Sequence, residues 1–228
     1  MTALHAATLA VASLLLSTVT NAALVPIFNT GVDANGAVLA NGTTPDPHYA
    51  LVSVPSGSTA TVVLRSAGGF PIGPWLPDSS TSAWISPNNG NVNNQSDPVG
   101  NYVFRTSFDL SGLSPNTAII TGKWSTDNAG TDIRLNGVSV MKTEFQTAAT
   151  QFQLGYVPFI ISGSGFKQGV NTLDFVVNNA SGASGNPVGL RVELNGTAAV
   201  PEPSTYLAGA LLGLPFGLTL LRAYRKKA

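Results

Sequence analysis

The chain has 228 residues with no net formal charge, and only 10% of its residues are charged. It contains no cysteine, which excludes disulfide bonds and thiolate metal sites, so an apolar core must stabilise the fold. Four of the eleven Lys and Arg residues lie in the last seven positions, which leaves residues 23–200 with seven basic and ten acidic residues, a net charge of −3. This segment is long enough for one domain and has no basic patch, so we expect no nucleic-acid partner.

The first 22 residues predict a secretory signal peptide. An apolar run covers residues 9–16, and Thr20-Asn21-Ala22 places small residues at positions −3 and −1 of a cleavage site before Ala23. The segment before the apolar run lacks Lys and Arg, which departs from the usual pattern. We expect the chain to be exported and its mature part to begin at Ala23.

Short strands separated by turns rich in Gly, Asn, Pro and Ser are predicted between residues 23 and 200. Residues 102–110, 173–177 and 190–194 alternate in the way that gives a strand one buried face. Further strands are expected at residues 24–29, 60–64, 118–126 and 159–161, and Asn136-Gly137 predicts a tight hairpin turn. This spacing predicts an all-β fold, an antiparallel β-sandwich over residues 23–200. The expected core contains Phe104, Phe108, Ile133, Leu135, Leu173, Phe175 and Val192.

The sequence gives little support for a catalytic site. His48 is the only histidine in residues 23–200, and no Gly-x-Ser-x-Gly motif accompanies it, so we expect its ring to be satisfied by a backbone group. A glycosidase needs two paired carboxylates, but nothing in the spacing pairs Glu144 with Glu193. We therefore predict a protein that is not an enzyme. The alternative is a secreted carbohydrate-active hydrolase whose site is assembled only by the fold.

Three aromatic residues are candidates for stacking on a sugar, which requires flat exposed rings near amides or carboxylates. Trp75 lies in the segment 68–101, which is rich in Pro and Asn and is expected to wrap one end or edge of the sandwich. Trp84 precedes Ile85, which favours burial, and Tyr49 follows His48. We expect Trp75 to be the exposed ring.

Three oxygen-bearing side chains, Asp127, Asn128 and Asp132, lie close together in the sequence. Carboxylate and amide oxygens are the ligands that Ca²⁺ prefers, so these residues predict a structural calcium site. Asp and Asn also favour turns without any metal, because their side chains hydrogen-bond to the nearby backbone. Both interpretations stay open.

The order of motifs over residues 102–194 resembles the galactose-binding-domain-like jelly roll. The resemblance implies a jelly-roll sandwich, of which many sugar-binding members carry calcium. Domains of this type bind sugars, lipids or peptides, so the fold does not fix the ligand. The motifs are Tyr102-Val-Phe-Arg-Thr-Ser-Phe-Asp-Leu, Lys123-Trp-Ser-Thr-Asp-Asn, Asp132-Ile-Arg-Leu-Asn-Gly-Val and Phe166-Lys-Gln-Gly-Val-Asn-Thr-Leu-Asp-Phe-Val-Val-Asn.

The last 28 residues combine a Pro-Glu-Pro motif, an apolar run over residues 205–221 and a basic cluster. This order resembles the PEP-CTERM sorting signal of Gram-negative bacteria that make exopolysaccharide. The resemblance implies processing near the motif by exosortase, a protease-transpeptidase of the inner membrane. The residues are Pro201, Glu202 and Pro203 in the motif, and Arg222, Arg225, Lys226 and Lys227 in the cytoplasmic basic cluster.

Residues 206–221 would span about 24 Å as a helix. The hydrocarbon core of a bilayer is about 30 Å thick, so this segment favours a transient transmembrane stop over a durable anchor. The alternative is an ordinary single-span anchor. We expect an exported surface or extracellular-matrix protein that associates with exopolysaccharide, or alternatively a purely structural or adhesive subunit.

Overall fold

A computed structural model of the chain describes residues 21–40, 42, 44–58, 62–64, 70–73, 75–87, 96–142, 151–181 and 186–201. Strands and turns dominate this part of the chain, and the elements follow one another as β1 (Ala22–Leu24), β2 (Ala50–Ser53), β3 (Val62–Leu64), β4 (Ile85–Pro87), β5 (Gly100–Asp109), β6 (Ser114–Asp127), β7 (Ala129–Leu135), β8 (Val138–Lys142), the 3-10 helix η2 (Gln151–Gln153), β9 (Val157–Ser162), β10 (Val170–Asn179) and β11 (Gly189–Ala199).

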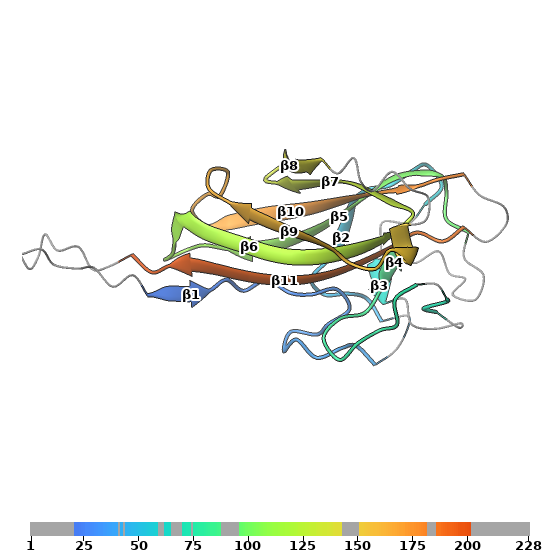
Figure 1. Cartoon of the computed structure of the whole chain (residues 1–228), viewed down its shortest axis with the longest axis horizontal. Coiled ribbons are helices and arrows are strands. Elements are labelled where there is room, and N and C mark those ends of the chain that lie inside the picture. The colour runs from blue at the N-terminus through green and yellow to red at the C-terminus, as the bar shows by residue number, and fades with distance from the viewer. Residues whose placement is uncertain are drawn as a thin grey trace, which may run out of the picture.

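The strands form two antiparallel sheets that lie one behind the other (Figure 1). The first sheet has the order β3-β4-β11-β6-β9, with β1 also paired to β11, and the second sheet has the order β2-β5-β10-β7-β8. From β5 to β11, every connection except β7–β8 crosses from one sheet to the other. This arrangement confirms the predicted antiparallel β-sandwich and its jelly-roll type.

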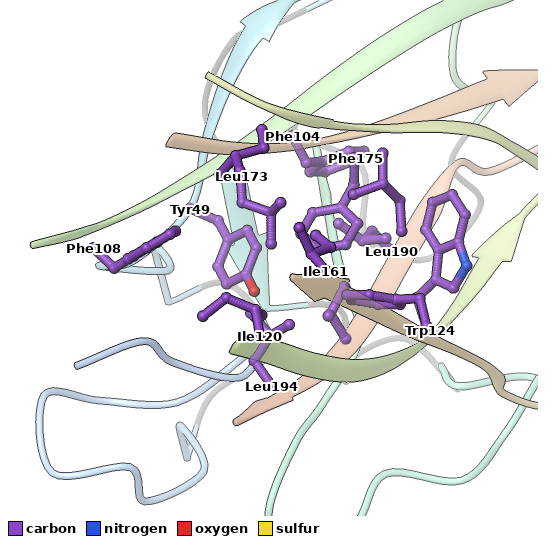
Figure 2. Packing of buried hydrophobic residues seen from close by; sticks show 14 of the residues in the cluster. Tyr49, Phe104, Phe108, Ile120, Trp124, Ile161, Leu173, Phe175, Leu190 and Leu194 are labelled. Atoms are coloured by element: carbon purple, nitrogen blue, oxygen red, sulfur yellow. The ribbon is translucent and has the colours of Figure 1, made fainter. Parts of the chain in front are cut away.

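The core lies between the inner faces of the two sheets (Figure 2). Phe175 of β10 is fully buried, and its ring centroid lies 5.7 Å from that of Trp124 and 6.0 Å from that of Phe159. A Cβ added at Gly122 would lie 2.5 Å from the Phe159 ring, so glycine is required at this point of β6. All seven residues expected in the core are buried, which confirms the predicted strand faces.

The predicted Asn136-Gly137 hairpin connects β7 to β8. Asn136 and Gly137 have φ values of 51° and 83°, as a two-residue turn with two left-handed positions requires. The side chain of Asn136 also donates to the carbonyl of Gly165 at 2.8 Å and accepts from the backbone N–H of Thr172 at 3.1 Å. The turn is therefore fixed to the loop that precedes β10.

The predicted strand over residues 24–29 is shorter than expected and starts earlier. β1 covers Ala22–Leu24, and Pro26, which has no N–H, cannot continue a strand ladder. The chain still follows β11 beyond this point, because Val25 donates to the carbonyl of Gly196 and Thr30 donates to that of Val192. The predicted signal-peptide cleavage before Ala23 would remove the first residue of β1.

Most residues of the predicted signal peptide and of the predicted sorting tail lie outside the part of the chain that the structure describes. Residues 1–20, which form most of the signal peptide, lie outside the described residues, and so do Glu202, Pro203 and the basic cluster Arg222, Arg225, Lys226 and Lys227. Pro201 is described and exposed. Among the described residues, no helix has the length and apolar character needed to cross a membrane.

Candidate functional site

The outer face of the first sheet carries a shallow polar groove over β6, β9 and β11. The strand register places Lys123 of β6 between Glu193 of β11 and Pro158 of β9. Two residues further along the strands, Thr121 lies opposite Asn195. These side chains point away from the core because their neighbours in sequence point into it. The groove has a volume of about 320 Å³ and is lined by Thr121, Gly122, Lys123, Pro158, Glu193 and Asn195.

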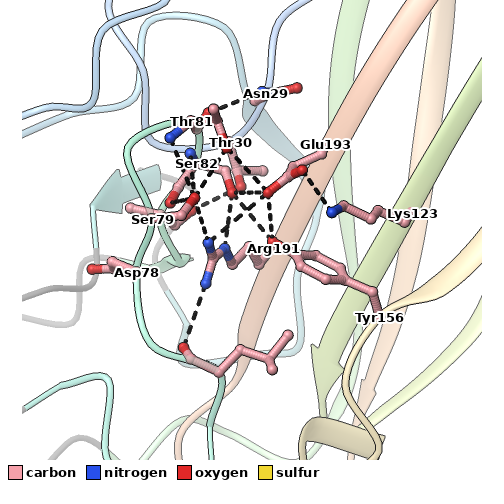
Figure 3. A network of polar contacts seen from close by, with 12 residues as sticks. Asn29, Thr30, Asp78, Ser79, Thr81, Ser82, Lys123, Tyr156, Arg191 and Glu193 are labelled. Carbon is pink, nitrogen blue, oxygen red and sulfur yellow. Dashed lines mark hydrogen bonds and ion pairs between the residues drawn. The ribbon is translucent and has the colours of Figure 1, made fainter.

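The carboxylate of Glu193 is held from several directions (Figure 3). Its Oε2 accepts from Lys123 Nζ at 2.9 Å, while its Oε1 accepts from Ser82 Oγ at 2.8 Å and from the Tyr156 hydroxyl at 3.0 Å. Partial burial raises the pKa of Glu193, but the hydrogen bonds from Lys123, Ser82 and Tyr156 outweigh it and lower the pKa overall. Glu193 is therefore a fixed, ionised acceptor at neutral pH.

Arg191 fastens the segment of residues 75–83, which we call the strap, beside the groove (Figure 3). Its side chain is only 2% exposed. Its guanidinium donates to Ser82 Oγ and Ser79 Oγ, each at 2.9 Å, and to the backbone carbonyls of Leu76 and Pro77. Because its rigid planar guanidinium makes four hydrogen bonds to the strap, Arg191 fixes where the strap presents its hydroxyl groups.

Tyr156, just before β9, completes the wall at this end of the groove. The ring of Tyr156 lies 4.5 Å from Lys123 Nζ and 5.4 Å from the Arg191 guanidinium carbon, which is within the range of cation–π contacts. Burial raises the pKa of Tyr156 to about 12, so its hydroxyl stays protonated and donates to Glu193. The strap and Tyr156 together hold the Lys123–Glu193 pair in one arrangement.

The prediction that Trp75 is exposed is wrong. Its ring is 4% exposed and packs on Trp84 with a centroid distance of 4.3 Å, and its Nε1 donates to Asp127 Oδ2 at 2.8 Å. A Cβ at Gly189 would lie 2.6 Å from the Trp75 ring, so the strap sits directly on β11. The segment 68–101 was expected to wrap one end or edge of the sandwich, but its described part contributes buried aromatic rings and strand β4 of the first sheet.

Trp84 and Tyr49 are buried as well. Trp84 is fully buried, as its sequence context predicted, and its Nε1 donates to the carbonyl of Leu76 at 2.8 Å. Tyr49 is 5% exposed and its hydroxyl donates to the carbonyl of Phe28 at 3.0 Å. In this structure, none of the three aromatic candidates offers a ring face to a sugar, and all three stabilise the fold instead.

The three residues predicted to bind calcium are buried and have separate partners. Asp132 accepts from Arg134 Nε and Ser139 Oγ, each at 2.7 Å, while the side-chain oxygen of Asn128 accepts from the backbone N–H of Ala180 at 2.8 Å. Asp127 accepts from the Trp75 indole. No group of three or more His, Asp or Glu side chains suited to a metal occurs within the described ranges. Calcium binding at this loop stays a prediction.

Burial raises the pKa of Asp127 to about 7. The hydrogen bond from Trp75 lowers this pKa, and the nearby charge of Asp97 raises it. Asp127 Oδ1 is buried and has no hydrogen-bond partner. This carboxyl group therefore titrates near neutral pH in the folded domain.

The ring of His48 has a backbone partner, as the sequence predicted. Its ring stacks on Phe28 with a centroid distance of 3.7 Å, and its Nε2 lies 3.0 Å from the carbonyl oxygen of Asp33.

The sequence analysis did not single out Lys123, Tyr156 or Arg191 as site residues. Alternation in residues 190–194 placed Glu193 on the outer face, but only the strand register identifies Lys123 as its partner.

No protein-family model matches the chain, and no curated protein matches it either. Solved structures that show a distant likeness include two carbohydrate-binding modules and a cyclase. A CBM35 from Paenibacillus barcinonensis is 15% identical, with a TM-score of 0.34, over 65% of this chain and 92% of that one. A family 35 carbohydrate-binding module from Clostridium thermocellum is 12% identical, with a TM-score of 0.30, over 78% and 97%. A cyclase from Fischerella sp. TAU is 12% identical, with a TM-score of 0.40, over 80% and 100%. At these values the likeness carries no information on function.

Proposed function

We propose that the chain is a non-catalytic glycan-binding protein whose site is the groove on the outer face of the first sheet. The observation that supports this most strongly is the fixed Lys123–Glu193 pair at 2.9 Å on an accessible polar face. Each sugar hydroxyl can both donate and accept a hydrogen bond, so a carboxylate beside an ammonium group suits adjacent hydroxyls. Thr121 and Asn195 add a hydroxyl and an amide to the same groove.

A neutral glycan suits this groove better than a polyanion. The charges of Lys123 and Glu193 compensate each other, and Arg191 is buried behind the strap. Salt should therefore weaken binding only slightly, because few charges are neutralised in the complex.

A hydrolase is the less favoured function. Glycoside hydrolysis uses two carboxyl groups, one of which has a raised pKa and acts as an acid. Glu193 has a lowered pKa, and its described hydrogen-bond partners are hydroxyl groups and Lys123. The groove is thus equipped to bind hydroxyl groups, and Glu193 is the only carboxyl group among its described lining residues.

Affinity electrophoresis of the purified chain in gels that contain neutral polysaccharides tests this proposal. We expect retarded migration of the wild type that persists in moderate salt. Lys123→Met should weaken binding about tenfold, because it removes a charged donor from the groove and leaves Glu193 with only the buried Arg191, at 4.0 Å, as its counter-charge. Arg134→Met changes a similarly exposed basic residue on the second sheet and serves as the control, which should bind like the wild type. Unretarded migration of the wild type would instead favour a purely structural or adhesive role.

We further propose that this protein is exported, sorted through its C-terminal tail by exosortase and delivered to the surface or extracellular matrix, where exopolysaccharide is its partner. The signal-peptide pattern and the order of motif, apolar run and basic cluster support this. Intact mass of the native protein should give a species that begins at Ala23 and ends near Pro203. A mature surface protein that still carries residues 222–228 would contradict the sorting proposal.

A further inference from the structure

The groove has different surroundings at its two ends. Beyond the Lys123–Glu193 pair, the next pair along the same strands is Ser125 opposite Arg191, and both residues are almost completely buried. The strap and Tyr156 hold the Glu193 carboxylate there through three hydroxyl groups (Figure 3). The accessible surface therefore ends at this wall.

The other end of the groove continues onto exposed apolar side chains. Ile160 lies opposite Thr121 and is 67% exposed, and Ile119, one pair further, is 40% exposed. Leu24 of β1 lies opposite Thr197 on the other side of β11 and is 82% exposed. Exposed apolar residues that gather beside a polar groove are typical of a binding surface.

The register gives the length of this surface. Successive outward-facing pairs are two residues apart, which is about 6.7 Å along a strand. Three pairs follow each other from Lys123–Glu193 through Thr121–Asn195 to Ile119–Thr197. They span about 13 Å, which is the length of a short oligosaccharide of about three sugar units.

We propose that the groove binds the end of a neutral polysaccharide chain, which lies along β6 and β11 with its terminal sugar against the wall. This inference rests on the proposed function. The terminal sugar meets Lys123 and Glu193, where hydroxyl groups find a donor and an acceptor. The next units lie over Ile160 and Ile119, where the apolar C–H faces of sugar rings lose contact with water. A chain that ran across the strands at the level of Glu193, Lys123 and Pro158 would leave these apolar residues unused.

Isothermal titration of the purified full-length chain with linear and cyclic glucans of the same linkage and length tests the proposal. One pair of probes consists of malto-oligosaccharides and cyclodextrins, and the other consists of linear and cyclic β-glucans. The cyclic compounds serve as the comparison because a ring has no chain end. In the series that binds, we expect the affinity to rise up to about three units and then stay constant. The cyclic form should bind at least tenfold more weakly than the linear one.

Ile160→Ser should weaken binding of the trisaccharide about fivefold and leave the monosaccharide unchanged, because it removes apolar contact area beyond the first sugar only. Val138→Ser is the matched control, since Val138 is also 67% exposed but lies on β8 of the second sheet. Equal affinity for cyclic and linear glucans would overturn the chain-end proposal, while a loss of binding in Lys123→Met would still support the groove as the site. If the wild type binds no glycan of either series, both proposals fail together.

Discussion

Phe175→Ala is expected to lower the free energy of unfolding by about 3–5 kcal/mol. Phe175 is fully buried, and its ring packs against the rings of Trp124 and Phe159 of the first sheet and of Tyr49, the residue just before β2. Removing it leaves a cavity at the centre of the sandwich, where the surrounding strands are hydrogen-bonded and cannot move inward. Urea titration followed by tryptophan fluorescence measures the effect.

Two variants show whether the loss arises from the core position. Val170→Ala lies on the same strand at a site that is 58% exposed, and it should cost less than about 0.5 kcal/mol. Ile133→Val removes one methylene group opposite Phe175 on β7 and should cost about 0.5–1.5 kcal/mol, which keeps a measurable transition if Phe175→Ala does not fold. A loss below about 1 kcal/mol for Phe175→Ala would mean that the inner and outer faces of β10 are reversed.

The second large effect is a pH dependence of stability that comes from Asp127. Its pKa is about 7 in the folded domain and 3.8 ordinarily, so the folded state favours the protonated carboxyl group. The contribution of this group to the free energy of unfolding is therefore fully present below about pH 4. It is lost as the pH rises through 7, and the total loss is up to about 4 kcal/mol. Burial and the neighbouring charge of Asp97 both oppose ionisation.

Asp127→Asn stays neutral at every pH and keeps an acceptor for the Trp75 indole. The difference in unfolding free energy between this variant and the wild type should therefore increase in favour of the variant between pH 4 and pH 8. Using the difference removes contributions from Asp46 and Asp78, whose pKa values burial also raises. Asp97→Asn removes the like charge and should move the midpoint to lower pH. A difference that does not vary with pH would rule out Asp127 as the titrating group.

Alternation along the strands was sufficient to predict the sandwich and its core. Phe104 and Phe108 alternate with outward-facing residues along β5, and Phe175 does so along β10. Such a pattern can be recognised in each strand by itself. The Asn136-Gly137 turn was equally local, because few residue pairs accept two left-handed positions. The short strands β2 and β4 escaped prediction, since they have few residues and owe their pairing to longer neighbours.

The site could not be predicted in the same way, because it depends on contacts between distant parts of the chain. Trp75 was expected to be exposed since it follows Gly73-Pro74, but its burial depends on Gly189 and Asp127, which are far away in the sequence. The pairing of Lys123 with Glu193 follows from the register of β6 with β11, which no local pattern encodes.

The measurement that tests the central claim most directly is NMR mapping of the purified chain during titration with a neutral oligosaccharide that retards it in affinity gels. We expect chemical-shift changes at residues 119–123, 158–160 and 193–197, and at the side-chain amide of Asn195. The outer face of the second sheet, where Arg105 pairs with Asp174, should stay unchanged and serves as the internal reference. Shift changes confined to the second sheet or to the loop around Asp127 would contradict the assignment of the groove as the glycan site.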